Sequence, residues 1–349
     1  MRIVVNNIAA SSGGAMTVLK DFYLSVCEND KENEWIFLLG DKYFEETENV
    51  KIITLPQIKK NPIKKVMFDF FSGKNFINNL KPDVVFSMQN IITFGTRAPQ
   101  IVYIHQSIPF QKVKHFSFFK KNERALAVKQ YLVGFLIKLS AKKSQKVIVQ
   151  TKWMKDAVCK QCNLPSDKVS QISPNVKNIT HLKSESLFQN FKFFYPTAPA
   201  VYKNNDCIFE ACKLLDSNNI KYNVTLTLPS EYAKPNIDCI GRVSYEDVIE
   251  WYNKSTLIFP SYIETFGYPL VEARTLGGIV LASDCAFSRE ALEGYENAYF
   301  FDPFKPQQLA ELMEKVVKCE ITKKNVEIIG EDSRNSWLDV INTVVNLHI

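Results

Sequence analysis

The stretch from residue 256 to residue 276 constrains the fold of this chain more than any other. An apolar run, Thr256–Pro260, leads into a loop that contains Ser261 and Gly267, and a helical pattern starts near Pro269. A short apolar run bounded by turn residues predicts a buried strand, and a strand followed by a helix is the repeating unit of a parallel sheet. In such sheets, ligands bind where the carboxyl ends of strands meet helix N-termini. The stretch therefore predicts both an α/β fold and a ligand site.

Two carboxylates in this stretch suggest which ligand it binds. Glu264 lies in the loop and Glu272 follows eight positions later, in the first turn of the helix. The backbone amides of Phe266, Gly267 and Tyr268 would be open donors at the helix start, where the helix dipole favours an anion. A phosphate on these amides, with hydroxyl groups on the carboxylates, suits a sugar nucleotide. The alternative is purely structural, because a Glu in a first turn stabilises the dipole without any ligand.

The same alternation of apolar runs and helical patterns fills both halves of the chain. It begins at Arg2–Asn6 and begins again at Phe191–Tyr195, after a polar, irregular stretch at 177–190. With 349 residues, of which 46% are hydrophobic, the chain is long enough for about two domains. We predict an N-terminal domain at 1–176 and a C-terminal domain at 177–330.

The first half contains two candidate ligand contacts. Gly13 and Gly14 lie in a loop of small residues after the first strand, where a phosphate or sugar could approach the backbone. The loop is not G-x-G-x-x-G, and no acidic residue at dinucleotide spacing supports NAD, so a plain tight turn is the alternative. His105 follows the apolar run Ile101–Ile104, and the carboxyl end of a buried strand is where a side chain faces the crevice. A lone His is otherwise most often structural.

The second half adds two cations at comparable places. Lys203 lies between a predicted strand and the predicted helix Asp206–Leu215, where an ammonium group would meet a diphosphate. Arg242 follows Gly241 at a predicted turn, which would bring a guanidinium group towards the same crevice. A surface lysine is the alternative for Lys203. Glu290 is predicted to begin a further helix.

Composition excludes several other classes. Eight scattered cysteines favour reduced thiols in the cytoplasm, and Cys159 and Cys162 have no second ligand pair at zinc spacing, so we expect no metal. A net charge of +6 fits anionic small ligands or an anionic membrane surface and does not demand nucleic acid. We expect Met1–Val5 to form a strand and not a signal peptide. No apolar run approaches the roughly 20 residues of a membrane span.

Residues 110–143 combine aromatic and basic side chains. Phe110, Phe116, Phe119 and Phe135 alternate with many lysines in one or two predicted amphipathic helices. This composition is typical of a segment that lies on a membrane surface. The alternative is that the apolar face packs on the domain and the lysines are solvated. The lysines at positions 59, 60, 64 and 65 would extend the basic surface.

Taken together, the second half resembles the family 4 retaining glycosyltransferases of the bacterial cell-surface polysaccharide type, whose E-x7-E motif matches Glu264 and Glu272. The resemblance covers most of the chain and is more specific in its C-terminal half. It implies the GT-B architecture, in which two Rossmann-like, doubly wound domains face a cleft. The residues that match in order and spacing are Pro260, Ser261, Glu264, Phe266, Gly267, Pro269, Glu272, Ala273, Gly277 or Gly278, Ala282, Ser283, Asp284, Glu290, Phe301, Asp302 and Pro303.

The resemblance implies roles for these residues. Glu272 would hold the ribose of the nucleotide, Glu264 would hold the donor sugar, and Lys203 would neutralise the diphosphate. From the N-terminal, acceptor-binding domain, Gly14 would approach the donor and His105 would line the sugar pocket. The last helix, within 331–349, would pack back on that domain. The implied catalytic residues are His105, Lys203 and Glu264. The implied donor-binding residues are Gly13, Gly14, Lys203, Arg242, Ser261, Glu264, Thr265, Phe266, Gly267, Tyr268 and Glu272.

The chain departs from the family pattern at one place. The family commonly has an Arg about five residues before the phosphate lysine, but no cation stands near Thr197 and Ala198 in this chain. Either Arg242 takes its place, or Lys203 acts alone with the helix dipole.

The expected activity is transfer of a sugar from a nucleotide-sugar donor to a lipid-linked or growing polysaccharide acceptor. The resemblance implies retention of anomeric configuration, and no metal-binding Asp-x-Asp is present, so we expect no metal and no cofactor. The expected location is the cytoplasm or the inner face of the cell membrane. Two alternatives remain: a nucleotide-sugar 2-epimerase on the same fold, and a catalytically silent binding subunit.

Overall fold

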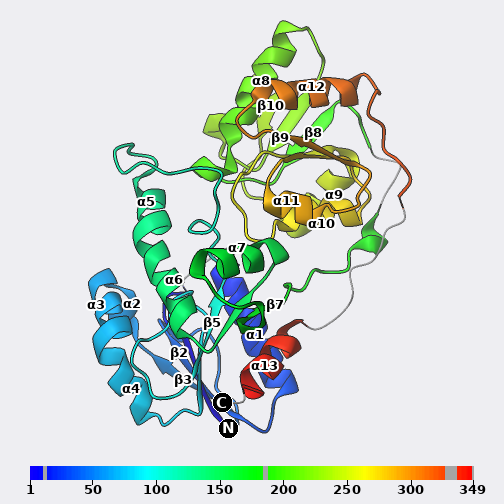
Figure 1. Cartoon of the computed structure of the whole chain (residues 1–349). Helices are drawn as coiled ribbons and strands as arrows, with labels where there is room; N and C mark the ends of the chain where they lie inside the picture. Colours follow the sequence, from blue (N-terminus) through cyan, green and yellow to red (C-terminus); the bar gives the residue numbers. More distant parts are fainter. Residues whose placement is uncertain (11–13, 184–187, 327–335, 348–349) are drawn as a thin grey trace. The chain divides into compact units, whose positions relative to one another are not determined.

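The computed structural model describes residues 1–10, 14–183, 188–326 and 336–347, and Figure 1 shows the course of the chain. The chain divides into two compact units. The first comprises Met1–Gln111, Ala125–Asn175 and Arg334–Ile349, and the second comprises Lys112–Arg124 and Val176–Ser333. These bounds depart from the predicted ones at residues 112–124, which belong to the second unit. Phe116 and Glu123 are buried in this segment, which explains why it is not a free surface loop.

The first unit is built on a seven-stranded parallel sheet in the order β3-β2-β1-β4-β5-β6-β7. The strand order changes direction between β1 and β4, and such a switch point opens a crevice at the carboxyl edge of a sheet. Inner strands are apolar on both faces because helices cover both sides. The strands are β1 (Arg2–Asn7), β2 (Glu34–Leu39), β3 (Val50–Thr54), β4 (Val84–Ser87), β5 (Gln100–Ile104), β6 (Lys146–Val149) and β7 (Val169–Gln171).

The C-terminal helix α13 (Ser336–Val345) packs in the core of the first unit. Its Trp337 contacts Phe22 of helix α1 (Gly14–Asn29) edge to face, with ring centroids 5.7 Å apart. The other helices of this unit are α2 (Pro56–Lys59), α3 (Pro62–Met67), α4 (Gly73–Asn79), α5 (Arg124–Ala127), α6 (Gly134–Lys143) and α7 (Lys152–Cys162). A π-helical turn, Phe68–Ser72, joins α3 to α4 without a break in the helical backbone. A second π-helical turn, Val128–Val133, joins α5 to α6.

The second unit has a six-stranded parallel sheet in the order β10-β9-β8-β11-β12-β13. Its switch point lies between β8 and β11, so the loops after these two strands flank the crevice of this sheet. The strands are β8 (Lys192–Tyr195), β9 (Asn223–Leu226), β10 (Ile237–Cys239), β11 (Thr256–Phe259), β12 (Val280–Ser283) and β13 (Ala298–Phe301). The helices are α8 (Asn205–Ser217), α9 (Tyr245–Lys254), α10 (Tyr268–Thr275), α11 (Ala286–Ala291) and α12 (Pro306–Val317).

One predicted helix start is wrong. Glu290 does not begin a helix, because α11 starts four residues earlier, at Ala286, and Glu290 lies in its last turn. The start is fixed by Cys285 at the N-cap, whose backbone N–H donates to the Ser288 hydroxyl at 3.1 Å. Within the described ranges of the chain, no helix combines the length and hydropathy that a membrane span requires.

Candidate functional site

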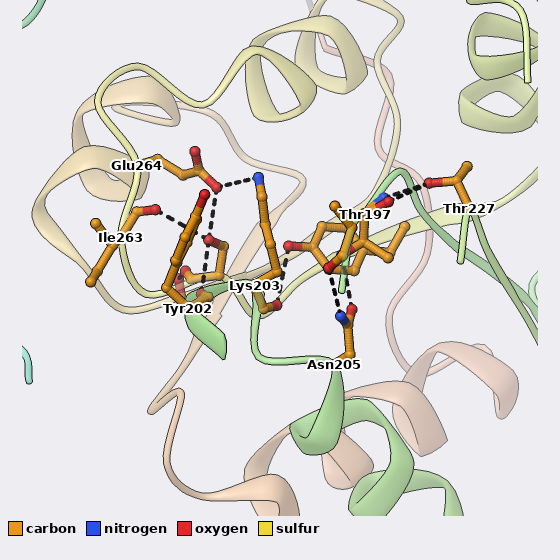
Figure 2. A network of polar contacts seen from close by, with 11 residues as sticks. Thr197, Tyr202, Lys203, Asn205, Thr227, Ile263 and Glu264 are labelled. Atoms are coloured by element: carbon orange, nitrogen blue, oxygen red, sulfur yellow. Dashed lines mark hydrogen bonds and ion pairs between the residues drawn. The ribbon is translucent and has the colours of Figure 1, made fainter. Parts of the chain in front are cut away.

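An ion pair joins the two loops at the switch point of the second sheet. Lys203 ends the short helical turn Val201–Lys203 after β8, and Glu264 lies in the loop after β11. The Lys203 Nζ lies 2.6 Å from Glu264 Oε1, and Figure 2 shows the two side chains pointing toward one another. The two side chains are 20% and 18% exposed, so the charges are largely desolvated but within reach of a ligand. An ammonium group held in this way can meet a phosphate beside a carboxylate that accepts hydroxyl groups.

Ser261 links Glu264 to the backbone of the neighbouring loop. Its hydroxyl donates to Glu264 Oε1 at 2.7 Å and lies 3.2 Å from the carbonyl oxygen of Tyr202. The amide of Tyr262 also donates to the Tyr202 carbonyl, at 3.1 Å. The two loops are therefore joined by backbone as well as by the ion pair, which fixes the separation of the two charges.

Asn204 holds three strand ends together. It adopts a left-handed backbone conformation at φ 57°, which Asn tolerates better than most residues. Its amide nitrogen donates to the carbonyl of Pro260 at 3.2 Å and to that of Pro303 at 2.7 Å. The loops after β8, β11 and β13 are thus tied by one side chain immediately after Lys203.

The loop where the family pattern has an arginine is fixed by uncharged groups. The Thr197 amide donates to the Thr227 hydroxyl at 2.7 Å, and that hydroxyl donates back to the Thr197 carbonyl at 2.8 Å (Figure 2). Arg242 is exposed and follows β10, which β9 separates from β8. Between the described residues we find no contact of Arg242 with Lys203 or Glu264. Its substitution for the missing arginine stays a prediction.

Glu272 lies in the second turn of α10 and not in the first turn as predicted, because the helix starts at Tyr268, and it faces two tyrosines of α9. The Tyr245 hydroxyl donates to its Oε1 at 3.2 Å, and the Tyr252 hydroxyl donates to its Oε2 at 3.1 Å. Only 9% of the residue is exposed, and this burial raises the pKa of the Glu272 carboxyl, against the opposing effect of the two hydroxyl groups. Each carboxylate oxygen retains a further lone pair, so Glu272 can still accept a hydroxyl group of a ligand.

The helix α10 starts where the sequence predicts backbone amides for an anion, at Phe266, Gly267 and Tyr268, and their role as ligand donors stays a prediction. Gly267 is its N-cap at φ 83°, a backbone conformation that a side chain would strain, and an added Cβ would also lie 3.3 Å from Leu270. In the part of the chain that the structure describes, the amides of Phe266 and Gly267 donate no backbone hydrogen bond. The rings of Phe266 and Tyr268 contact each other at 4.9 Å, and Thr265 is half-buried beside them.

The remaining predicted residues belong to the first unit. Gly13 lies outside the described residues, and Gly14 begins α1. His105 follows β5, as predicted, and its amide donates to Asn90 Oδ1 at 2.8 Å, while Asn90 Nδ2 lies 3.2 Å from its Nε2. Because Asn90 Nδ2 can only donate, we assign the ring proton of neutral His105 to Nδ1. Burial lowers the pKa of His105 to about 4, so the imidazole is neutral at neutral pH.

His105 should make the protein less stable in mild acid. Its folded pKa of about 4 lies below the unfolded value of 6.5, so the unfolded chain binds the proton more readily between these pH values. The contribution is intact above pH 6.5 and is lost as the pH falls through 4, by roughly 3 kcal/mol in total. Urea unfolding of wild type and His105→Gln at pH 7 and pH 4.5 checks this. A wild-type stability that falls no more than that of the variant would contradict it.

The sequence did not single out several residues of this site. Asn204, Thr227 and the two tyrosines on Glu272 act through contacts between segments far apart in the chain. A signal existed for the tyrosines only, because Tyr245 and Tyr252 are seven positions apart and therefore lie on one face of a helix.

Residues 200–335 match the family described as Glycosyl transferases group 1, and this segment contains Lys203, Glu264 and Glu272. The O-antigen chain mannosyltransferase RfbU of Salmonella typhimurium is 24% identical over 207 residues, which make up 55% of this chain and 54% of that protein. The match therefore spans about half the length of this relative. Both findings agree with the predicted enzyme class, a transferase that acts on sugars.

Solved structures resemble the whole chain. WaaG, a glycosyltransferase involved in lipopolysaccharide biosynthesis, has a TM-score of 0.69 at 13% identity, over 99% of this chain and 100% of WaaG. Anabaena HepE in complex with UDP-glucose has a TM-score of 0.59 at 15% identity, over 92% of this chain and 90% of HepE. The predicted fold class, α/β with the two Rossmann-like domains of GT-B glycosyltransferases, is confirmed. A cleft between the domains stays a prediction.

Proposed function

We propose that this chain is a retaining, metal-independent glycosyltransferase that moves a sugar from a nucleotide-sugar donor to a lipid-linked or growing polysaccharide acceptor. The observation that carries the proposal is the Lys203–Glu264 pair at the switch point of the second sheet. This pair lies within residues 200–335, the segment that matches the group 1 glycosyl transferases. The functions of RfbU and WaaG support an acceptor of the cell-surface polysaccharide kind, and the UDP-glucose bound to HepE supports a nucleotide-sugar donor.

The chemistry follows from the charges of the site. Breaking the bond between the sugar and the diphosphate leaves negative charge on the phosphate oxygens, which the Lys203 ammonium and the amides of Phe266 and Gly267 stabilise. Glu264 binds hydroxyl groups of the donor sugar, and Glu272 binds those of the ribose. The acceptor oxygen forms a bond to the sugar carbon as the phosphate leaves, and the leaving phosphate takes the proton of the acceptor hydroxyl. In this scheme the Lys203 ammonium, and not a metal ion, neutralises the diphosphate. Glu264 is not a covalent nucleophile in this scheme, because its role is to bind the sugar hydroxyls.

A donor screen tests the proposal directly. Purified protein is incubated with UDP-, GDP- and dTDP-sugars, with and without Mg²⁺ and EDTA, and nucleoside diphosphate release is measured. Release from one donor class that persists in EDTA is the expected result. A catalytically silent binding subunit is the second candidate, favoured by the lack of a cation near Thr197. Such a subunit would release nothing from any donor.

The proposed acceptor would be met at an anionic membrane surface. Of the aromatic residues in the segment 110–143, Phe110 and Phe116 are buried, so the alternative of packing on the protein holds for them. The helix α5–α6 nevertheless leaves large apolar side chains exposed, among them Leu132 at 61% and Phe135 at 65%, with Lys129 and Lys142 exposed nearby. Exposed apolar side chains with lysines on one helix are typical of membrane-surface helices.

The double variant Leu132→Ser/Phe135→Ser should bind anionic vesicles about tenfold more weakly than wild type, because both side chains lose the transfer into lipid. Vesicle flotation at low salt measures the binding. Leu24→Ser, at another exposed leucine, is the matched control and should float like wild type. If wild type itself does not float, the membrane proposal is wrong.

A further inference from the structure

Residues 112–124, here called the strap, belong to the second unit, although the chain on either side belongs to the first. The strap is fixed at its base by a buried carboxylate. Glu123 accepts the Ser117 amide at 2.9 Å and pairs with Lys114 at 3.2 Å, and Lys120 lies 3.8 Å away. The backbone hydrogen bond of Ser117, and then Lys114, hold the pKa of Glu123 below its usual value, so the carboxylate stays charged.

The base of the strap reaches the loop that contains Glu264. The Lys114 ammonium lies 5.8 Å from the centre of the Tyr262 ring, and Phe304 contacts the same ring at 5.3 Å. Tyr262 is buried, and within the described part of the chain its hydroxyl finds no hydrogen-bond partner. Polar atoms therefore do not fix this ring; its position depends on the side chains packed around it.

Tyr262 is in turn built into the candidate site. Its amide donates to the Tyr202 carbonyl, next to Lys203, and its neighbour Ser261 donates to Glu264. The residue that carries the Tyr262 ring is therefore connected, through its backbone and through its neighbour Ser261, to both sides of the Lys203–Glu264 pair.

We propose that the strap, through Lys114 and the Tyr262 ring, positions the loop 261–264 for the donor sugar. The part of this inference that concerns the donor rests on the proposed function. Lys114 is a positioning residue, since it acts through Tyr262. The tip of the strap is exposed instead: Phe119 is 93% exposed, and Lys120 and Lys121 beside it are exposed as well.

Hydrogen exchange of the full chain tests the positioning without any ligand. Lys114→Met should speed exchange of the Tyr262 amide, which donates to the Tyr202 carbonyl, about tenfold, with protection elsewhere in the sheet unchanged. Lys112→Met, an exposed lysine of the same strap, is the matched control and should exchange like wild type. Equal exchange in the two variants overturns the proposal.

A second variant separates positioning from the loss of a buried charge pair. Lys114→Met/Glu123→Gln leaves no unpaired carboxylate, so its overall stability should recover, while exchange at Tyr262 should stay about tenfold faster than in wild type. Wild-type exchange in this double variant would overturn the inference. Lys114→Arg keeps a cation over the Tyr262 ring, so the Tyr262 amide should exchange as slowly in this variant as in wild type.

Calorimetry measures the effect of the strap on ligand binding. In Lys114→Met, affinity for the nucleotide-sugar found in the donor screen should fall about tenfold, while affinity for the matching nucleoside should not change, because Glu272 lies outside this loop. An equal loss for both ligands would overturn the positioning role. If wild type takes up no nucleotide, the proposed function fails, and the exchange comparison still decides on the strap.

Discussion

A Lys203→Met variant should release nucleoside diphosphate from its donor roughly 100- to 1000-fold more slowly than wild type, as is typical when one preorganised donor of a charge-stabilising site is lost. The Lys203 ammonium is the cation that the structure places at the switch point of the second sheet, 2.6 Å from Glu264. The nearby loop at Thr197 is held by hydroxyl groups and an amide, which are uncharged. Among the described contacts of these two loops, Lys203 supplies the positive charge, so its removal should leave a departing diphosphate poorly stabilised.

Steady-state turnover with saturating donor measures this effect, and Lys213→Met is its control. Lys213 lies in the same unit and pairs with Glu210 at 2.7 Å, but both side chains are exposed, so the same substitution removes a surface pair of little value. The control should turn over like wild type. Turnover in Lys203→Met within threefold of wild type would show that Lys203 does not stabilise the leaving group.

Glu272→Gln should weaken nucleotide binding about 10- to 100-fold, the usual value of a hydrogen bond to a charged group. The same variant should be more stable than wild type when no ligand is bound. Burial raises the pKa of Glu272 in the folded protein, so the folded state holds the proton more tightly than the unfolded chain. The contribution to stability is full below the unfolded pKa and is lost as the pH rises through the folded pKa. Glutamine, which does not ionise, avoids this loss at neutral pH.

Isothermal calorimetry with nucleoside diphosphates and urea unfolding, both at pH 7, measure the two effects. Glu210→Gln, at an exposed glutamate, should change neither. Glu272→Ala should abolish donor hydrolysis together with nucleotide binding. Hydrolysis that survives in Glu272→Ala would remove Glu272 from the site.

The elements of the fold were predictable where the pattern is local. Helix α9, Tyr245–Lys254, is of this kind, because its capping residue Ser244 and its amphipathic repeat lie next to each other in the sequence. The π-helical turn at Phe68–Ser72 was not predictable, because it changes the hydrogen bonding of a helix and not its hydrophobic pattern. The strap was missed for another reason, since its burial depends on Tyr262, which lies more than a hundred positions further along the chain.

The sequence predicted which charged residues form the candidate site, but not how they are arranged relative to one another. Lys203 and Glu264 are 61 positions apart, and only the strand order, with β8 beside β11, brings them together. The tyrosines on Glu272 likewise depend on α9 packing beside α10. Roles for His105 and Gly14 in the same reaction stay predictions, since both belong to the first unit.

Asn204 determines when the loops of the second unit lose their conformational entropy. Its side chain fixes the carbonyl groups of Pro260 and Pro303, so the loops after three strands are ordered before any ligand arrives. The conformational entropy of these loops is therefore lost during folding and not during binding. Nucleotide uptake should carry little cost of stiffening the chain, and its entropy should reflect released water instead.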